Sequence, residues 1–292
     1  MITFTRLGTY GRLGNQLFQY AILLAVGAKN NYEVKIPILD DKKWHGQLCL
    51  LNNFNITAKT LEPTDHIEHH YNEMDHKLNH PSNRSGYDPA VFSVPDNCDL
   101  FGYFGDYRYL KEYENLIIKE LTPKASIIER SRNRLAQIKE RYPGYLIVSL
   151  HIRRGDTSLD MYSRSDMAIL DSNSVYYSYL CEAKKIFKDV KCKFLVFTGG
   201  SQTDNTESDY VWCRNNLNTD EYIYCDGNNS TMDDFTLMYL SDAHILSPLS
   251  TMSWWVGFLD KKNNKITVAP KKYWYLIQEM PNGFYPDNFL LI

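Results

Sequence analysis

The sequence lacks the features that define several common classes of protein. Its six cysteines include no C-x-x-C pair and no cysteine–histidine spacing typical of a zinc site. The formal net charge is −3, so no general affinity for nucleic acid is expected. We therefore expect reduced cysteines, as in a cytosolic protein, and any anion binding must come from a local cluster of basic residues.

Long apolar runs are missing as well. The longest apolar segment, residues 20–28, is too short to span a bilayer, and the N-terminus lacks the basic region and apolar core of a signal peptide. These absences predict a cytoplasmic protein without a transmembrane segment. A group of lysines near the C-terminus forms either a solvated edge, which we favour, or a peripheral contact with the inner membrane face: Lys261, Lys262, Lys265, Lys271 and Lys272.

Three motifs that commonly bind nucleotide phosphates are also absent. The chain has no Walker loop, no G-x-G-x-x-G fingerprint and no D-x-D metal pair. The loop of residues 8–14 has G-x-x-G-x-x-G spacing, which differs from the dinucleotide fingerprint. The histidines of residues 66–80 show no spacing that supports metal binding. The sequence therefore favours neither an NAD site nor a metal site.

What is present is a regular alternation of strand and helix signals. Residues 2–5, 15–30 and 33–37 predict a strand, a helix and a strand, which together make a βαβ unit. Residues 38–95 are polar and weakly periodic, and they predict loops and short helices. The rest of this half continues with a strand at 99–104 and helices at 110–121 and 124–141.

The second half repeats the alternation more clearly. Its predicted strands, each followed by a helix or the chain end, are 145–150, 194–197, 222–224, 244–246 and 266–268. Such a series implies an α/β protein with a parallel sheet covered by helices. We expect two Rossmann-like domains, residues 1–142 and 143–272, divided at Pro143-Gly144. Residues 273–292 are a candidate addition to the first domain.

Three polar features of the second half follow predicted strands. The first is the run from His151 to Asp156, which contains Arg153 and Arg154. The second is Thr198-Gly199-Gly200-Ser201, and the third is Ser250-Thr251 with Ser253 at a predicted helix start. Because strand ends of open α/β sheets are where ligands bind, these features are expected to share one crevice. An arginine there can hold phosphate oxygens with two parallel hydrogen bonds.

Simpler interpretations of these residues stay open. Ser250-Thr251 either caps a helix or binds phosphate through exposed N–H groups. Asp233 and Asp234 either cap the following helix or, if buried, contact a base or ribose. Arginine and helix N–H groups can neutralise a leaving diphosphate as a metal ion does, so the pattern suggests a nucleotide-sugar diphosphate held by arginine.

Several blocks of this sequence resemble glycosyltransferase family 11, the α-1,2-fucosyltransferases. They occur in the family's order over nearly the whole chain. The blocks are Gly11-Arg12-Leu13-Gly14-Asn15-Gln16-Leu17-Phe18-Gln19-Tyr20-Ala21, Gly102-Tyr103-Phe104, His151-Ile152-Arg153-Arg154-Gly155-Asp156, Leu237-Met238, Ser250-Thr251-Met252-Ser253-Trp254-Trp255 and Lys265-Ile266-Thr267-Val268-Ala269-Pro270-Lys271-Lys272.

The resemblance implies a GT-B fold, in which the parallel sheets of two Rossmann-like domains face each other across a cleft. It implies that the second domain binds GDP-fucose and the first lies on the acceptor side. The implied reaction is an inverting transfer of L-fucose from GDP-β-L-fucose to the 2-hydroxyl of a terminal β-galactoside. The implied partners are that donor and a galactose-terminated glycan, with neither a metal ion nor another cofactor.

The resemblance also implies roles for single residues. Arg153 would hold the β-phosphate with the support of Arg154, and His151 and Asp156 would shape the same loop. The catalytic base is left open among Asp156, Asp160 and His151. The remaining residues expected to bind substrate are Arg12, Gly14 and Asn15 towards the donor sugar and acceptor, and Thr198, Gly199, Asp234, Ser250, Thr251 and Ser253 towards the nucleotide.

Two departures from the family pattern concern the nucleotide side. Thr198-Gly199-Gly200 stands where bacterial relatives commonly have Ser-Asp-Asp, and Pro248-Leu249 stands where asparagine and serine are usual. These differences bear on ribose and base contacts and on acceptor range more than on the reaction. The alternatives are a fucosyltransferase of another linkage, acting on a core or chitin-type glucosamine, and a glycan-binding protein without catalysis.

Overall fold

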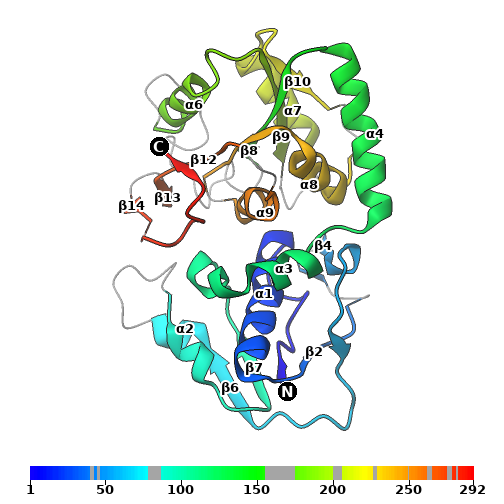
Figure 1. Cartoon of the computed structure of the whole chain (residues 1–292), viewed down its shortest axis with the longest axis vertical. Coiled ribbons are helices and arrows are strands. Elements are labelled where there is room, and N and C mark those ends of the chain that lie inside the picture. The colour runs from blue at the N-terminus through cyan, green and yellow to red at the C-terminus, as the bar shows by residue number, and fades with distance from the viewer. Residues whose placement is uncertain are drawn as a thin grey trace. The chain divides into compact units, whose positions relative to one another are not determined.

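The computed structural model consists of two compact units (Figure 1). Unit 1 comprises Met1–Lys124 and Pro281–Asp287, and unit 2 comprises Ala125–Met280 and Asn288–Ile292. The residues that the structure describes are 1–39, 43–44, 47–77, 87–154, 175–199, 206–225, 229–248, 250–261, 265–274, 278–280 and 282–292. Within these ranges, no helix is long and apolar enough to cross a membrane.

Unit 1 contains a sheet whose five described strands are all parallel, in the order β5-β2-β1-β7-β6. The strands are β1 (Ile2–Thr3), β2 (Val34–Ile36), β5 (Lys59–Thr60), β6 (His69–Asn72) and β7 (Cys98–Phe101). The remaining described elements of the unit are α1 (Leu13–Asn30), the hairpin β3 (Lys43–Trp44) and β4 (Gln47–Leu48), α2 (Glu73–Lys77), α3 (Glu114–Glu120) and four 3-10 turns, η1 (Leu51–Asn53), η2 (Pro89–Ser93), η3 (Tyr107–Tyr109) and η4 (Lys111–Tyr113).

Helix α1 forms the centre of unit 1. Every residue from Gln16 to Gly27 is buried, which fits a sequence that is largely apolar on all sides and free of proline. The helix ends where Asn31 takes a left-handed conformation (φ 57°) and its N–H donates to the Gly27 carbonyl. The predicted strand, helix and strand at the N-terminus are confirmed.

The prediction of loops and short helices for residues 38–95 is wrong in one respect, because β5 and β6 of the sheet lie there. Both strands are at the edges of the sheet and carry exposed polar residues, such as Lys59 in β5 and His69 in β6. Edge strands with few inward side chains lack the alternation of apolar residues by which strands are predicted.

Unit 2 contains a second parallel sheet, with six described strands in the order β10-β9-β8-β11-β12-β15. The strands are β8 (Leu146–Arg153), β9 (Cys192–Gly199), β10 (Tyr222–Tyr224), β11 (Ala243–Ile245), β12 (Thr267–Ala269) and β15 (Leu290–Leu291). The other elements are α4 (Ala125–Arg141), α6 (Val175–Lys185), α7 (Thr206–Asn216), α8 (Thr231–Leu240), α9 (Thr251–Leu259) and the hairpin β13 (Lys272–Trp274) and β14 (Gln278–Glu279). The predicted α/β class with two parallel sheets is confirmed.

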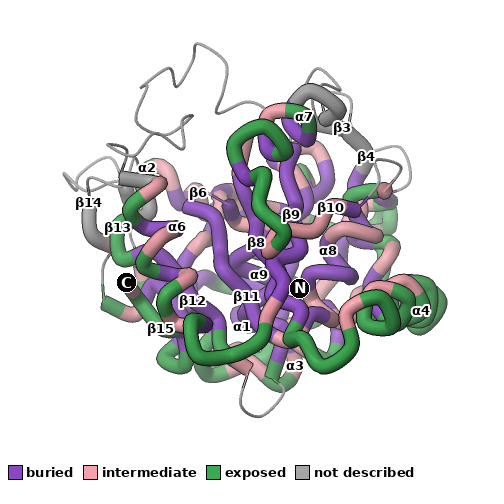
Figure 2. Tube along the Cα trace, turned by 90° about the horizontal axis from the view of Figure 1, so that it is seen from above, coloured by how far each residue is buried: buried purple, intermediate pink, exposed green. Residues whose placement is uncertain are grey.

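The two faces of β8 pack against different partners. Val148, Leu150 and Ile152 join an apolar core with residues of α6 and α7. Ser149, His151 and Arg153 point to the opposite face, because successive side chains of a strand alternate. The central strands β8, β9 and β11 are buried along most of their length (Figure 2). This alternation places the polar side chains of β8 together on one face of the sheet.

The division between the units differs from the predicted boundary at residue 142. Helix α4 precedes that point but belongs to unit 2, because it packs along α8. Arg130 of α4 pairs with Asp233, and Lys139 pairs with Asp242. The C-terminal segment is shared: residues 281–287 belong to unit 1, whereas β15 pairs with β12 in unit 2.

The close approach of α9 to β12 depends on the absence of a side chain at Gly257. A Cβ atom there would lie 2.7 Å from both the Phe289 ring and the Thr267 methyl group. We expect Gly257→Ala to lower the free energy of unfolding by about 1–3 kcal/mol, as overpacked cores do. Thermal denaturation followed by circular dichroism measures the change. Gly105→Ala is the control, because no atom beyond its chain neighbours lies within 4 Å of its Cβ position, and equal effects of the two variants would contradict the packing.

Candidate functional site

The sheet of unit 2 has a topological switch point between β8 and β11. The chain passes from β8 through β9 to β10 on one side, and from β11 through β12 to β15 on the other. Ligands of open α/β sheets bind outside the carboxyl ends of the strands at such a point. Strand β8 ends there with Arg153, which is partly exposed. Arg153 therefore lies at the carboxyl end of β8 beside the switch point, the position at which the sequence placed it, and its role in binding a ligand stays a prediction.

A chain of serines joins the strands at this switch point to helix α9. The Arg153 N–H donates to Ser247 Oγ at 2.9 Å, and the Ser247 N–H donates to Ser253 Oγ at 3.3 Å. Ser250 is the N-cap of α9, and its Oγ accepts from the Ser253 N–H at 3.2 Å. All three serines are buried. The capping interpretation of Ser250 is confirmed, and Thr251 is the first, partly exposed residue of α9.

Strand β9 brings two more predicted residues to the same edge. In the parallel register Ile152 pairs with Thr198, and Arg153 pairs with Gly199. Both strands are longer than predicted, since β8 continues through Arg153 and β9 through Gly199. The predicted strands covered only the continuous apolar runs, so they left out the alternating polar and apolar residues at the end of β8 and the polar end of β9.

His151 lies within β8 and not in a loop beyond it, which corrects its predicted place. Its side chain is 4% exposed. Burial, and secondly the charge of Arg153, lower the pKa of His151 to about 3. The imidazole is therefore neutral at pH 7 and adds no positive charge beside Arg153.

Arg154 is held by helix α7. Its Nε donates to Asp209 Oδ1 at 3.2 Å, and its guanidinium carbon lies 3.9 Å from the centre of the Trp212 ring. Both ionic groups are largely buried, which strengthens the pair relative to one on the surface. Nothing in the sequence around Asp209 indicates this contact, because it joins residues 55 positions apart.

Asp233 and Asp234 have different roles in α8. Asp233 accepts from the Ser230 N–H in a capping box and pairs with Arg130, so the N-cap is Ser230 and not either aspartate. Asp234 accepts from Asn229 Nδ2 at 2.7 Å. Desolvation raises the pKa of Asp234 to about 6. Asp234 is thus a partly buried carboxylate, close to the alternative that the sequence left open.

A second polar chain lies in the interior of unit 2. His244 Nδ1 is 2.8 Å from Ser149 Oγ, and its Nε2 is 2.9 Å from Asp260 Oδ2. These three residue types form catalytic triads elsewhere, but here all three side chains are buried in the interior of unit 2. Asp260 also accepts from Lys265, whose side chain is therefore turned inward and not part of a solvated lysine edge. The chain holds β8, β11 and the end of α9 together.

In unit 1, the glycine loop and the first turn of α1 form a second polar site. Gly11 has φ +89°, and a Cβ there would lie 2.6 Å from Asn15 Cβ, so the Asn15 side chain folds back over the loop. Arg12 is the N-cap residue of α1, and Gly14 lies buried in the first turn. The buried side chains of Gln16 and Gln19 donate to the carbonyls of Gly11 (3.1 Å) and of Tyr10 (2.8 Å).

Aromatic rings lie beside this loop, at the switch point of unit 1 between β1 and β7. Tyr10 stacks on Tyr103 with ring centres 4.7 Å apart and an angle of 20°. The exposed Arg6 guanidinium lies over Phe101 at 4.9 Å. A buried carboxylate, Glu73, accepts from the N–H groups of Tyr103 (2.7 Å) and Phe104 (3.0 Å) and fixes the turn that carries Tyr103. None of these contacts follows from local sequence.

Two predicted residues, Asp156 and Asp160, lie outside the described residues. Within the described ranges, no three histidine, cysteine or acidic side chains gather in a way that could hold a metal ion. The structure therefore brings Arg153, Thr198, Gly199, Ser250, Thr251 and Ser253 to one region of unit 2. Arg154 directly follows β8 and contacts α7, Asp234 lies in the first turn of α8, and Arg12, Gly14 and Asn15 lie together in unit 1.

Two solved fucosyltransferase structures resemble this fold. Fucosyltransferase NodZ from Bradyrhizobium aligns with a TM-score of 0.51 and 14% identity, covering 88% of this chain and 92% of its own. The apo form of POFUT1 aligns with a TM-score of 0.53 and 11% identity, covering 91% and 96%. At such low sequence identity the likeness shows only the fold, which is GT-B-like.

The chain belongs to glycosyl transferase family 11, because the sequence profile of that family matches residues 3–279. The predicted resemblance is thus confirmed. An alpha-1,2-colitosyltransferase of Escherichia coli is 24% identical over 94% of this chain and 93% of its own. The O-antigen biosynthesis glycosyltransferase WbnK of Escherichia coli is 25% identical over 90% and 92%. Galactoside alpha-(1,2)-fucosyltransferase 1 of Pan troglodytes is 25% identical over 85% of this chain and 63% of its own.

The raised pKa of Asp234 predicts a dependence of stability on pH. Because the folded state holds this proton up to about pH 6 and the unfolded state releases it near 3.9, stability falls as pH rises through that window. Asp234→Asn should therefore gain in melting temperature relative to the wild type between pH 4.5 and pH 7.5. Asp233→Asn is the control, since the Asp233 pKa is lowered and its contribution is lost at acid pH. A parallel pH profile of Asp234→Asn and wild type would contradict the assignment.

Proposed function

We propose that this family 11 glycosyltransferase transfers L-fucose from GDP-β-L-fucose to the 2-hydroxyl of a terminal β-galactoside, with inversion. The observation that carries the proposal is Arg153 at the β8–β11 switch point, with its backbone bound to Ser247. The α-1,2 linkage is supported by the colitosyl and fucosyl relatives, whose identity with this chain is 24–25%.

The proposed role of Arg153 is to bind the β-phosphate of GDP. Charge builds on that phosphate as the bond to the sugar breaks, so a guanidinium held in place stabilises the transition state more than the bound substrate. The N–H groups at the start of α9, beside Thr251, add partial positive charge at the same strand edge. The proposal includes no metal ion and no other cofactor.

The nucleoside would lie beside the same edge. We assign Thr198 and Gly199 to its surroundings because they pair in register with the end of β8. The Asp234 carboxyl group, largely desolvated and bonded to Asn229, offers a hydrogen-bond partner for a ribose or a base. Arg154 supports the site indirectly in this proposal, by fixing α7 through Asp209.

Unit 1 would supply contacts to the fucose and the acceptor, through Arg12, Gly14 and Asn15. The flat pair of Tyr10 and Tyr103 beside that loop suits the apolar face of a sugar ring. Inversion requires the acceptor hydroxyl to attack opposite the departing GDP, through an oxocarbenium-like state. His151 is a poor candidate for the base, because its pKa of about 3 gives it little affinity for a proton.

A colitosyl donor is the second candidate, since a relative that covers 94% of this chain is an alpha-1,2-colitosyltransferase. Transfer from GDP-fucose to lactose tests the first candidate directly. The expected product carries fucose in α-1,2 linkage on galactose, identified by NMR. Another linkage would indicate a different acceptor class, and transfer only from GDP-colitose would indicate the second donor. GDP binding without transfer from either donor would contradict both.

Arg153→Ala should lower kcat by roughly 10²–10³-fold, as the loss of one preorganised charge-stabilising donor does elsewhere. Arg153→Lys should be almost as poor, because an ammonium group cannot form two parallel bonds to a phosphate. Calorimetry should show weaker GDP binding by both variants, with circular dichroism confirming their fold. Arg132→Ala, an exposed arginine on α4, is the matched control. Near-normal fucosyl transfer by a folded Arg153→Ala variant would contradict the proposal.

A further inference from the structure

Gln19 is a buried polar residue of α1 whose side chain contacts two separate segments of unit 1. Its exposed fraction is 0%. The Nε2 group donates to the Tyr10 carbonyl at 2.8 Å and to the Gly102 carbonyl at 3.2 Å. A side-chain amide has two N–H donors, so these two contacts use both of them. Gln19 has no part in the roles proposed above.

The two segments that Gln19 joins carry a pair of stacked tyrosines. Tyr10 belongs to the glycine loop of residues 8–14, and Tyr103 follows Gly102 in the turn after β7. Both tyrosines are partly exposed, and their ring centres lie 4.7 Å apart. The attraction between two rings is small compared with the conformational freedom of two loops, so the stacking requires that the backbone of both segments be held.

The turn that carries Tyr103 has an unusual backbone conformation. Gly102 has φ +151°, and Phe104 has φ +50°, in the left-handed region that a phenylalanine rarely adopts. Such a turn persists only where the surrounding contacts hold it, and turns of this kind are concentrated at functional sites. Glu73 accepts from the N–H groups of Tyr103 and Phe104, while Gln19 donates to the Gly102 carbonyl. Two buried side chains therefore hold the turn.

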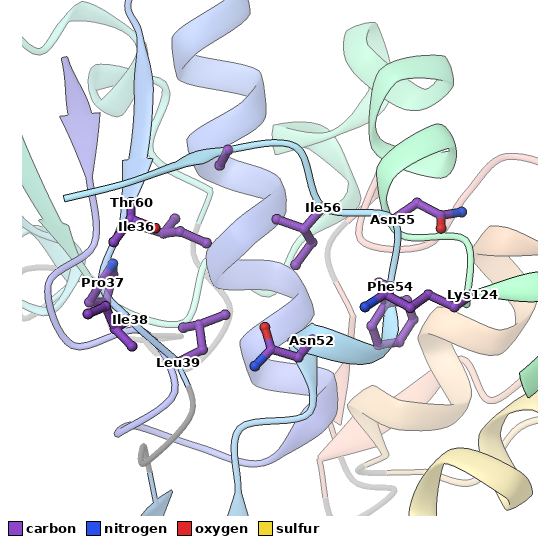
Figure 3. Close-up of a pocket in the computed structure, with 11 residues that line it drawn as sticks. Ile36, Pro37, Ile38, Leu39, Asn52, Phe54, Asn55, Ile56, Thr60 and Lys124 are labelled. Carbon is purple, nitrogen blue, oxygen red and sulfur yellow. The ribbon is translucent and has the colours of Figure 1, made fainter.

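Gln16, one turn of α1 earlier, holds the glycine loop from another direction. Its Nε2 donates to the Gly11 carbonyl, and its Oε1 accepts from the Leu50 N–H, both at 3.1 Å. Leu50 leads into η1, which packs against α1 and lines a pocket with residues that follow β2 (Figure 3, where Asn52 marks η1). Gln16 thus ties the loop to η1, and Gln19 ties the same loop to the Tyr103 turn.

We propose that Gln19 is a positioning residue of this enzyme. Its amide sets the separation between the glycine loop and the turn of residues 102–104, so that Tyr10 and Tyr103 form one flat surface for a sugar ring. The inference rests on the proposed function, in which unit 1 contacts the fucose and the acceptor. It adds the residue that makes this surface rigid before substrate binds, which lowers the cost of ordering it during the reaction.

Gln19→Met tests the role, because methionine has a similar length and offers no N–H donor. We expect kcat/KM for transfer from GDP-fucose to lactose to fall roughly 10–10²-fold, the effect of an ångström-scale misplacement. The affinity for GDP, measured by calorimetry, should stay at the wild-type value, since the residues proposed to bind GDP lie in unit 2. Gln19→Glu keeps the shape of the side chain without the amide donors and should behave alike. Gln137→Met, at an exposed glutamine of α4, is the matched control.

A double-mutant cycle distinguishes positioning from a general loss of structure. Tyr103→Ala should itself lower kcat/KM, and adding Gln19→Met should lower it less than about twofold further, because both changes remove the same surface. If Gln19 only stabilised the fold, the two losses would multiply. Multiplied losses, or near-normal kcat/KM in folded Gln19→Met and Gln19→Glu, would overturn the inference.

Hydrogen exchange followed by mass spectrometry tests the inference without relying on activity. In Gln19→Met, amides in peptides covering residues 8–14 and 100–105 should exchange about tenfold faster, as the loss of buried hydrogen bonds allows, while β8 is unchanged. Gln19→Glu takes its place if Gln19→Met does not fold. A wild type that transfers no fucose would contradict the proposed function, and the exchange would still decide the role of Gln19. Faster exchange in only one of the two peptides, or equally across both units, would contradict that role.

Discussion

The hydrogen bond from the Arg153 N–H to Ser247 Oγ fixes the strand ends of unit 2 at which we propose that the donor binds. It joins β8 to the chain that leaves β11, at the point where the order of the strands reverses. Beyond the strand ends no regular strand pairing among the described residues holds these two segments together. Two further hydrogen bonds, from the Ser247 N–H to Ser253 Oγ and from the Ser253 N–H to Ser250 Oγ, extend this connection to the first turn of α9. A guanidinium and a helix N-terminus thereby share one strand edge, which is a condition for holding a diphosphate without reorganisation.

Buried polar groups impose a further constraint, because each must find a partner inside the protein. His244 meets this requirement between Ser149 and Asp260, and so sets the register of β8 and β11 in the same sheet. In unit 1, Glu73 plays a comparable part by accepting from the backbone that carries Tyr103. In both units, buried polar residues support the strand ends at which the candidate sites lie. Substitution of these buried residues is poorly tolerated, because each substitution leaves a polar partner unsatisfied.

Much of the fold could be predicted from local pattern. The 18 residues of α1 carry an apolar sequence with a glycine loop before it, and their helix was expected to within two residues. The strands Lys59–Thr60 and His69–Asn72 could not be predicted, because they are polar edge strands defined by their neighbours. The extension of β8 through His151 and Arg153 was missed for a related reason, since a buried histidine looks polar in sequence and behaves as core in the fold.

The alternation of strand and helix, the family, and the candidate residues Arg153, Ser250 and Asn15 could be predicted before folding was considered, because they depend on short-range periodicity and contiguous motifs. Folding sets the partners: Ser247 for the backbone of Arg153, and Asp209 for the side chain of Arg154. These contacts join residues far apart in the chain. Their geometry and the desolvation that shifts the pKa values of His151 and Asp234 exist only once the chain is packed.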